Sequence, residues 1–190
     1  MNQKLNIIIF SIIFYFITHI IVAKETWIVD KELSTITFEL PIFLAKNVKG
    51  AFTEIEGLVE IDVEKKENNK AVFSVSIDSI EMNYKKYRDL LLSDIFFYEK
   101  NFPIALIDTK KFSYDNEREM ELMVELNIKG TRKEVPLQLI IIRLGESLVQ
   151  IKGSLNFSRT AYQIGMGKWS STAILKDKAT INTNLFLFKD

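Results

Sequence analysis

Apolar and polar residues alternate with a period of two along several segments of this chain, and no other feature constrains the fold more strongly. In Glu119–Ile128 every even position is apolar, from Met120 to Ile128, and four of the odd positions are Glu or Asn. Successive side chains of a β-strand point to opposite faces of the sheet, so such a segment buries one face and wets the other. The pattern is typical of antiparallel strands that cover a core on one side.

The alternation recurs in further segments of the chain. It is clear at 54–63, 71–78 and 149–157, and weaker at 35–40, 104–112, 135–144 and 179–188. Turn-forming residues lie between neighbouring segments, at 67–69, 115–116, 130–131 and 145–146. Such residues are typical of tight turns. The sequence therefore predicts a mostly β domain with about eight antiparallel strands.

Residues 83–102 break the alternation. Tyr84, Tyr87 and Leu91 recur there at the spacing of a helical face, which predicts one or two helical turns. Pro103 follows, and a proline restricts the residue before it to extended backbone. We therefore expect a short helical lid that ends before the strand at 104–112.

Eight antiparallel strands with one apolar face can form either a sandwich or a barrel. Small residues stand among larger ones on the apolar side, at Gly57, Ala71, Gly153 and Ala179. An eight-stranded barrel has room either for its own side chains or for one small ligand. The alternation alone leaves open whether the interior is filled or hollow.

The start of the chain has the pattern of an export signal. Lys4 supplies a positive charge, residues 5–22 are almost uninterruptedly apolar, and Ala23 is a small residue at the expected cleavage position. We therefore expect a signal peptide at 1–23 and one exported domain at 24–190. The alternative is an uncleaved anchor, because the apolar run is just long enough to cross a bilayer.

The composition excludes several classes of site. The chain has no cysteine, and its one histidine, His19, lies within the expected leader. The domain then has no residues for Ser-His-Asp or Cys-His catalysis and no His or Cys ligands for zinc or haem. Acidic and basic residues are balanced at 25 each, and no basic stripe marks a nucleic-acid surface.

Paired carboxylates are the remaining route to acid–base catalysis. The acidic residues of 54–62 and 119–125 alternate onto the wet face, so none is expected in an apolar pocket that would raise its pKa. We therefore expect a binding protein and no enzyme, with no metal and no cofactor.

Five segments, taken in order, resemble the YceI-like family of polyisoprenoid-binding proteins. They are WIVD at 27–30, VKGAF at 48–52, LLSDIFF at 91–97, LNIKGTRKEVP at 126–136 and SRTAYQIG at 158–165. The resemblance implies an antiparallel eight-stranded lipocalin-like barrel that encloses a long apolar chain such as an isoprenoid, in the periplasm or outside the cell. The chain departs from the family pattern at Leu33, Leu90, Ala161 and Gln163, and its pair Arg88 and Asp89 lies one residue closer to Ser93 than the similar pair of the family.

Two arginines are candidates for binding a polar head group. Arg159 continues the apolar series of 149–157, so an extended strand would point it into the rim of the barrel, where a guanidinium can hold a phosphate or carboxylate. The alternative is a structural arginine that pairs with a carboxylate or caps loop carbonyls near residues 164–165. Arg88, on the helical segment, is either a second anion contact or part of a solvated helix face.

The inward apolar residues are either core or the wall of a ligand pocket. We expect ligand contacts from Phe38, Phe52, Val59, Phe73, Val75, Phe96, Phe102, Leu122, Val124, Ile151 and Leu155, with Arg159 and Arg88 beside them. The aromatic residues before the strand at 104–112 either gate the ligand or close the barrel end. Because burial of each methylene contributes about 0.8 kcal/mol, an apolar tunnel is enough to bind a long chain.

We expect the protein to hold a long-chain lipid, isoprenoid or fatty-acyl, for carriage, storage or protection. Transient contact with a membrane and a homodimer both agree with that role. Two alternatives stay open: a side-chain-filled barrel that serves as a structural or protein-interaction module, and a binder tethered to the membrane by its leader.

Overall fold

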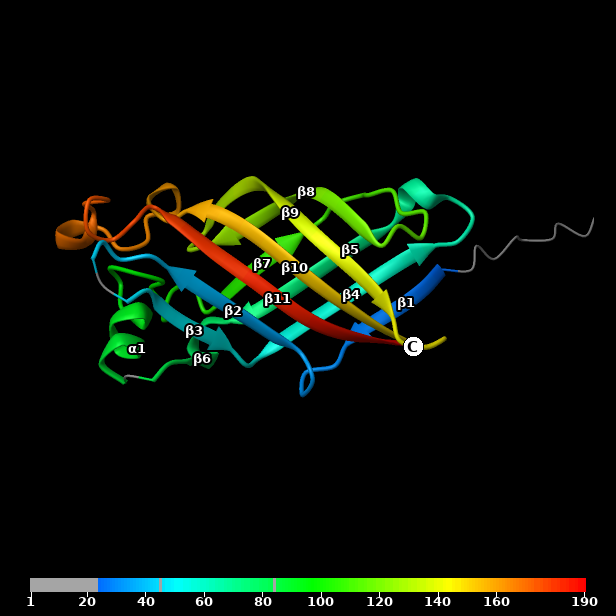
Figure 1. The fold of residues 1–190 in the computed structure, drawn as a ribbon, viewed down its shortest axis with the longest axis horizontal. Helices are drawn as coiled ribbons and strands as arrows, with labels where there is room; N and C mark the ends of the chain where they lie inside the picture. Colours follow the sequence, from blue (N-terminus) through cyan, green and yellow to red (C-terminus); the bar gives the residue numbers. More distant parts are fainter. Residues whose placement is uncertain (1–23, 45, 84) are drawn as a thin grey trace, which may run out of the picture.

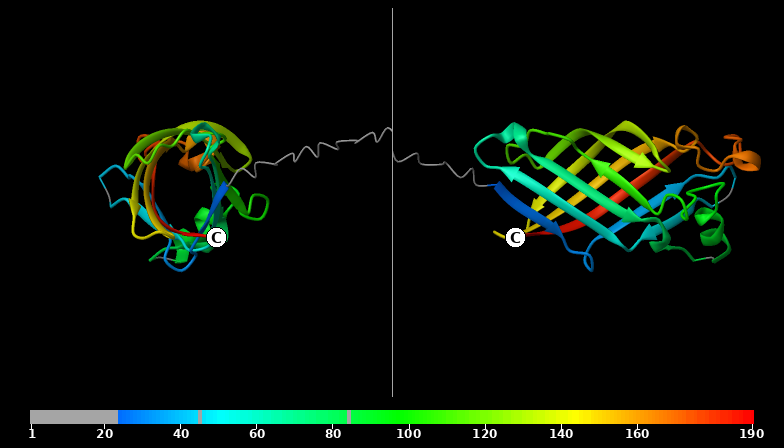
Figure 2. Two further views of the ribbon diagram at one scale, coloured as in Figure 1. Left: turned by 90° about the vertical axis from the view of Figure 1, so that its right-hand side faces the viewer. Right: turned by 180° about the vertical axis from the view of Figure 1, so that it is seen from behind.

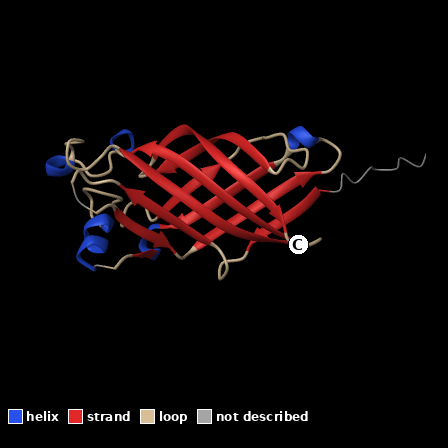
Figure 3. Cartoon of the chain, in the orientation of Figure 1, coloured by secondary structure: helices blue, strands red, loops and turns tan. Residues whose placement is uncertain are grey.

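The computed structural model describes residues 24–44, 46–83 and 85–190, which form one antiparallel sheet curled into a barrel (Figure 1, Figure 3). The strands are β1 (Lys24–Val29), β2 (Thr35–Leu40), β3 (Val48–Phe52), β4 (Ile55–Asp62), β5 (Lys70–Ser76), β6 (Ile80–Glu81), β7 (Ile104–Asp108), β8 (Glu119–Ile128), β9 (Thr131–Arg143), β10 (Leu148–Ser158) and β11 (Lys178–Lys189). The helical elements are α1 (Lys85–Leu92) and the short 3-10 turns η1 (Lys66–Asn68), η2 (Ile77–Ser79), η3 (Thr160–Tyr162) and η4 (Gly167–Trp169). The expected leader, 1–23, lies outside the described residues.

Eight strand positions close the barrel. Neighbouring strands follow the order β1-β4-β5-β7-β8-β9-β10-β11, and β11 pairs back with β1, with Leu187 opposite Val29. A view from the end of the molecule shows the resulting ring (Figure 2). The mostly β, antiparallel eight-stranded barrel expected from the sequence is therefore confirmed.

Three of the eight positions hold two strands each, which is why eleven strands fill eight positions. β11 pairs with β1 through residues 187–189 and with β2 through residues 180–184, so β2 continues the line of β1. β3 and β6 continue β4 and β5 in the same way, because β2 pairs with β3 and β3 with β6.

The sequence did not identify β1, β3 or the two-residue strand β6. β1 carries an exposed Ile28 on its wet face, and β3 has Gly50 on its inward face, so neither shows clean alternation. The break between β1 and β2 is a turn in which Asp30 Oδ1 accepts the backbone N–H groups of Glu32 and Leu33.

Most expected strand ends agree with the structure, but β9 begins at Thr131, four residues before the predicted start, and β7 is shorter than predicted. The alternation predicted a strand to Phe112, whereas β7 ends at Asp108. Lys110 has a φ of 54°, in the left-handed region, so the extended backbone stops before it. Phe112 forms only an isolated bridge with Asn69.

The expected short helix is confirmed as α1, which lies at one end of the barrel beside β3 and β6 (Figure 1). Within the described ranges, no helix has the length and apolarity needed to cross a membrane. At the same end, the β8–β9 hairpin turns through Lys129 and Gly130, whose φ angles are 52° and 72°. Two consecutive positive φ values are typical of the type I′ turn that favours glycine.

Glycines on the inward faces make room for aromatic rings on the neighbouring strands. A Cβ at Gly57 would lie 2.2 Å from Cδ1 of Phe73, its partner on β5, and one at Gly50 would lie 2.6 Å from the ring of Phe38 on β2. The small inward residues seen in the sequence therefore let large side chains lie close to the barrel wall.

Candidate functional site

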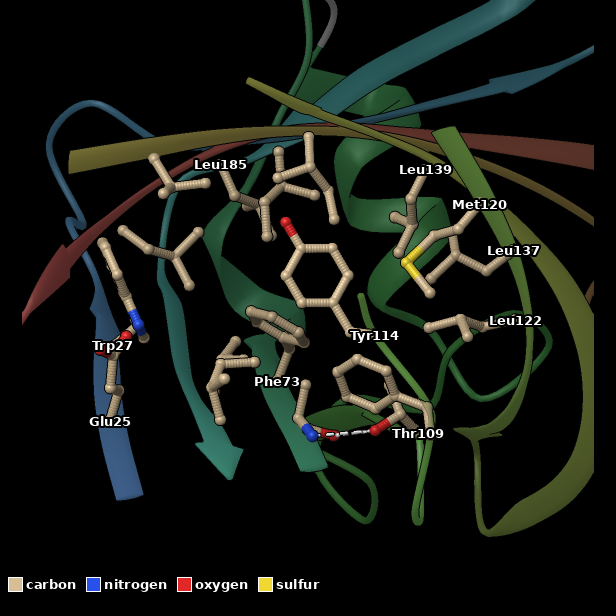
Figure 4. A pocket seen from close by; sticks show the side chains of 18 of the residues that line it. Glu25, Trp27, Phe73, Thr109, Tyr114, Met120, Leu122, Leu137, Leu139 and Leu185 are labelled. Carbon is tan, nitrogen blue, oxygen red and sulfur yellow. Dashed lines mark hydrogen bonds between the residues drawn. The ribbon is translucent and has the colours of Figure 1, made fainter. Parts of the chain in front are cut away.

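The half of the barrel away from α1 encloses a cavity of about 240 Å³, which we call the large cavity. Apolar side chains on the inward faces of its strands line it, among them Trp27, Phe73, Leu122, Leu137, Leu139 and Leu185 (Figure 4). Val59 and Ile151, which the sequence placed among the ligand contacts, line it as well. A concave, largely apolar wall with a few polar groups is typical of sites that bind apolar ligands.

Charged residues of the large cavity are held in polar contacts. Glu25 Oε1 accepts a hydrogen bond from Lys189 Nζ at 2.7 Å, and this bond is the main reason that the pKa of Glu25 lies below its usual value. Lys66 forms an ion pair with Asp115. These pairings leave the cavity with no large excess of either charge.

Arg143, the last residue of β9, also borders the large cavity. Its Nη2 donates a hydrogen bond to Asn116 Oδ1 at 2.9 Å. Both side chains are exposed, so they lie where the cavity meets solvent. A polar group of a ligand whose apolar part lies inside would meet these residues.

The position of Asp62 differs from the one that the sequence predicted. The alternation put its carboxylate on the wet face, but Asp62 is 5% exposed and borders the large cavity. It is the last residue of β4, and its Oδ1 accepts the backbone N–H groups of Lys65 at 2.8 Å and Glu64 at 3.1 Å. The bond from Lys65 is the largest cause that lowers the pKa of Asp62, so its carboxyl group stays ionised at neutral pH.

Tyr114 stands inside the large cavity, with its ring among the labelled apolar side chains (Figure 4). Its loop is tied to the turn between β4 and β5, because the Tyr114 N–H donates to the Lys66 carbonyl at 3.1 Å and the Phe112 N–H to the Asn69 carbonyl at 3.0 Å. Sequence reasoning missed Tyr114. The available signal was an aromatic residue in a polar loop, but the direction in which the Tyr114 side chain points depends on the tertiary structure.

A second cavity of about 70 Å³, which we call the small cavity, lies in the half of the barrel near α1. Five of the expected ligand contacts line it: Phe38, Phe52, Val75, Phe96 and Arg159. Aromatic packing occupies much of this half. The ring centroids of Phe38 and Phe52 are 5.6 Å apart, and those of Phe52 and Phe97 are 6.3 Å apart. The aromatic residues thus close this end of the barrel.

Arg159 lies at the closed end and is 1% exposed. Its N–H groups donate to backbone carbonyls at 2.8–3.0 Å, those of Ile164, Gly165, Trp169, Leu175 and Lys176. A guanidinium has five N–H groups, so all of them are engaged. The structure therefore shows the alternative in which Arg159 caps loop carbonyls, and no donor is left for the anion of a ligand.

Arg88 and Phe102 border neither cavity. Arg88 Nε donates to the Ile80 carbonyl at 2.9 Å, which ties α1 to β6. The ring of Phe102 lies beside Gly130, 2.9 Å from the position that a Cβ there would take, and packs edge-on against Tyr98. Both residues hold the elements of the closed end together.

Val124 and Leu155 point into the barrel, but they line neither cavity. Each is 1% exposed. Ile36 and Ile107 line both cavities. These four residues therefore lie where the large and small cavities meet.

A sequence model of the YceI-like domain matches residues 27–187 of the chain. No curated protein matches the chain.

Several solved structures share the fold. BcnA of Burkholderia cenocepacia aligns with a TM-score of 0.76 and 23% identity, over 83% of this chain and 98% of that one. A polyisoprenoid binding domain from Saccharophagus degradans, implicated in plant cell wall breakdown, aligns with a TM-score of 0.68 and 13% identity, over 86% and 98%. The YceI protein of Campylobacter jejuni aligns with a TM-score of 0.65 and 22% identity, over 79% and 89%.

Proposed function

The chain belongs to the YceI-like domain family, and from that premise we propose that the large cavity binds a ligand with an apolar chain, of isoprenoid or fatty-acyl type. The observation that carries the proposal is the cavity of about 240 Å³ inside a closed barrel, lined mainly by apolar side chains. Water in such a space finds few hydrogen-bond partners, so apolar cavities favour apolar occupants.

The apolar wall supplies enough binding free energy without a charged anchor. Each methylene that leaves water contributes about 0.8 kcal/mol, and a chain of about ten carbons outweighs a good part of the cost of association. Asn116 and Arg143 offer polar atoms to a head group at the solvent end of the cavity. The polar end of the ligand therefore lies there, and not at Arg159.

The chemistry of the cavity favours holding the ligand over changing it. The two carboxyl groups that border the cavity, Glu25 and Asp62, both have lowered pKa values, which is the opposite of what an acid catalyst needs. We infer a binding protein that carries, stores or shields its ligand. The apolar run before Ala23 supports export to the periplasm or beyond, where the ligand would pass between membranes or enzymes.

The printed description of the Saccharophagus degradans domain as polyisoprenoid binding supports an isoprenoid ligand. The structural alternative, a barrel filled by its own side chains, has support only in the half near α1, where aromatic rings and Arg159 occupy the interior. The hollow half favours ligand binding. Membrane contact and a homodimer stay predictions.

Solvent extraction of the purified native protein, followed by mass spectrometry, tests the proposal. A ligand with an apolar chain should be recovered in near-stoichiometric amount from protein made in its native host. Repeated extraction that returns no such molecule would contradict it.

A matched pair of variants on β8 locates the ligand. Leu122 lines the large cavity, whereas Met123, next along the strand, points outward and is 56% exposed. Leu122→Trp should fill the cavity and abolish recovery of the ligand, and Met123→Trp should leave recovery unchanged. Equal recovery from two folded variants would place the ligand elsewhere.

A further inference from the structure

The interior of the barrel is divided between the large and small cavities, and the division has a definite place. Val124 lies on β8 between Leu122, which lines the large cavity, and Leu126, which lines the small one. On β10, Leu155 pairs with Leu137 of the large cavity on one side and with Ile181 of the small cavity on the other. We call Ile36, Ile107, Val124 and Leu155 the partition.

Two residues of the partition, Val124 and Leu155, lie on the longest unbroken strand pairings of the sheet. β10 and β11 pair without a break from Leu148 to Ser158, and β8 and β9 pair without a break from Glu119 to Ile128. Val124 and Leu155 stand on these ladders and are each 1% exposed. Side chains packed to that degree on regular strands have little freedom to move aside, because protein interiors are close-packed.

We propose that the partition sets the longest apolar chain that the large cavity can enclose. This inference rests on the proposed function and adds the ligand's length to it. On β10, the stretch from Val149, which lines the large cavity, to Leu155 spans six residue steps. Six steps at about 3.3 Å and a strand tilt of about 40° leave roughly 15 Å along the axis.

A depth of roughly 15 Å accommodates an extended chain of about 12 carbon atoms, given ordinary carbon–carbon bond lengths. Twelve carbon atoms make up the main chain of three isoprene units, which have four each. A longer ligand would leave the remainder of its chain outside the cavity, in solvent or at another surface. Affinity should therefore rise with chain length up to three isoprene units and then level off.

The chain carries its own reporter for this experiment. Its two tryptophans are Trp27, which lines the large cavity, and Trp169, which packs against Phe96 at the closed end. Trp169 Nε1 is buried and has no hydrogen-bond partner, so Trp169→Phe removes no such bond. The full-length Trp169→Phe protein then reports on the large cavity through the fluorescence of Trp27.

Isoprenoid alcohols of two, three, four and eight isoprene units serve as probes, titrated into the Trp169→Phe protein. The step from two to three units should strengthen binding by at least about tenfold, since each enclosed methylene contributes about fourfold. Each later step should change the affinity by less than about threefold. An affinity that keeps rising through four and eight units would overturn the proposal of a partition.

Two Leu→Ala variants in that background provide the matched control. Leu155→Ala opens the partition, whereas Leu185→Ala enlarges the large cavity itself, because Leu185 lines it. Leu155→Ala should move the levelling point from three to four units, and Leu185→Ala should leave it at three. Val124→Ala removes fewer atoms from the partition and should also move the levelling point to longer chains. It replaces Leu155→Ala in the experiment if that variant does not fold.

The outcomes distinguish a failure of the partition proposal from a failure of the proposed binding function. If both leucine variants shift the levelling point equally, or if neither partition variant shifts it, the partition does not set the length. If no alcohol of any length produces a saturable change in Trp27 fluorescence, the binding function fails with it. Cooperative thermal unfolding of each variant confirms that the comparison is made on folded protein.

Discussion

The two halves of the barrel share the long strands β8 to β11, but one half is hollow and the other is filled. Around the large cavity, the inward side chains stop short of one another and leave about 240 Å³. Near α1, phenylalanine rings meet, and Arg159 ties the loops together, so only about 70 Å³ stays open. The closed half therefore contributes more to stability than the hollow half, because a cavity removes packing contacts.

The largest contrast is expected between the arginines of the two halves. Arg159→Met leaves five carbonyls, three of them in buried hydrogen bonds, without this donor and should lower the free energy of unfolding by about 5 kcal/mol. Arg143→Met, at the exposed end of the large cavity, should change it by less than about 0.5 kcal/mol. Urea unfolding of both variants measures the contrast. A similar small loss for both would show that the closed half has no special role in stability.

The second contrast is between two phenylalanines. Phe96 is 3% exposed and packs against Trp169, so Phe96→Ala should cost about 3–4 kcal/mol. Phe73 already borders the large cavity, so Phe73→Ala should cost about 1–2 kcal/mol less than Phe96→Ala. The same unfolding measurement applies, and a larger cost at Phe73 would reverse the comparison.

A smaller effect is expected from a glycine beside the large cavity. A Cβ at Gly57 would lie 2.2 Å from Phe73, so Gly57→Ala should push that ring into the cavity, cost about 1–3 kcal/mol and weaken binding of an isoprenoid alcohol by about tenfold. The matched control is Gly145→Ala, because nothing lies within 4 Å of a Cβ there. Fluorescence titration should find the control unchanged. Undiminished binding by Gly57→Ala would show that the ring has another place to go.

The smallest effect concerns the pH dependence of stability in the hollow half. The pKa of Asp62 is lower in the folded chain than in the unfolded chain, so its contribution is present above the unfolded value of about 4 and is lost as the pH falls through the folded value. The difference in unfolding free energy between the wild type and Asp62→Asn should be constant from about pH 7 to pH 5 and then shrink towards pH 2. A difference that grows on acidification would contradict the assignment.

The strands were predicted from the sequence more accurately than the residues of the site. Alternation placed Val59, Phe73, Leu122 and Ile151 on the inward face, as core or pocket wall, and the structure has them beside the large cavity. Tyr114 was missed because a loop has no periodicity from which to read a direction. Arg159 was assigned to the rim, with its two roles left open, because its carbonyl partners lie on loops that its own strand does not specify.

From the sequence alone, the period of two specifies antiparallel strands and which side of most of them faces inward, because this pattern is local to each strand. The closed barrel was expected only from the resemblance to the YceI-like family. The sequence also determined that the described domain has neither histidine nor cysteine. That one half is hollow and the other closed is seen only in the folded chain. Whether inward side chains meet across a barrel depends on ring closure, strand register and the volumes of residues far apart in sequence, and no local pattern records those distances.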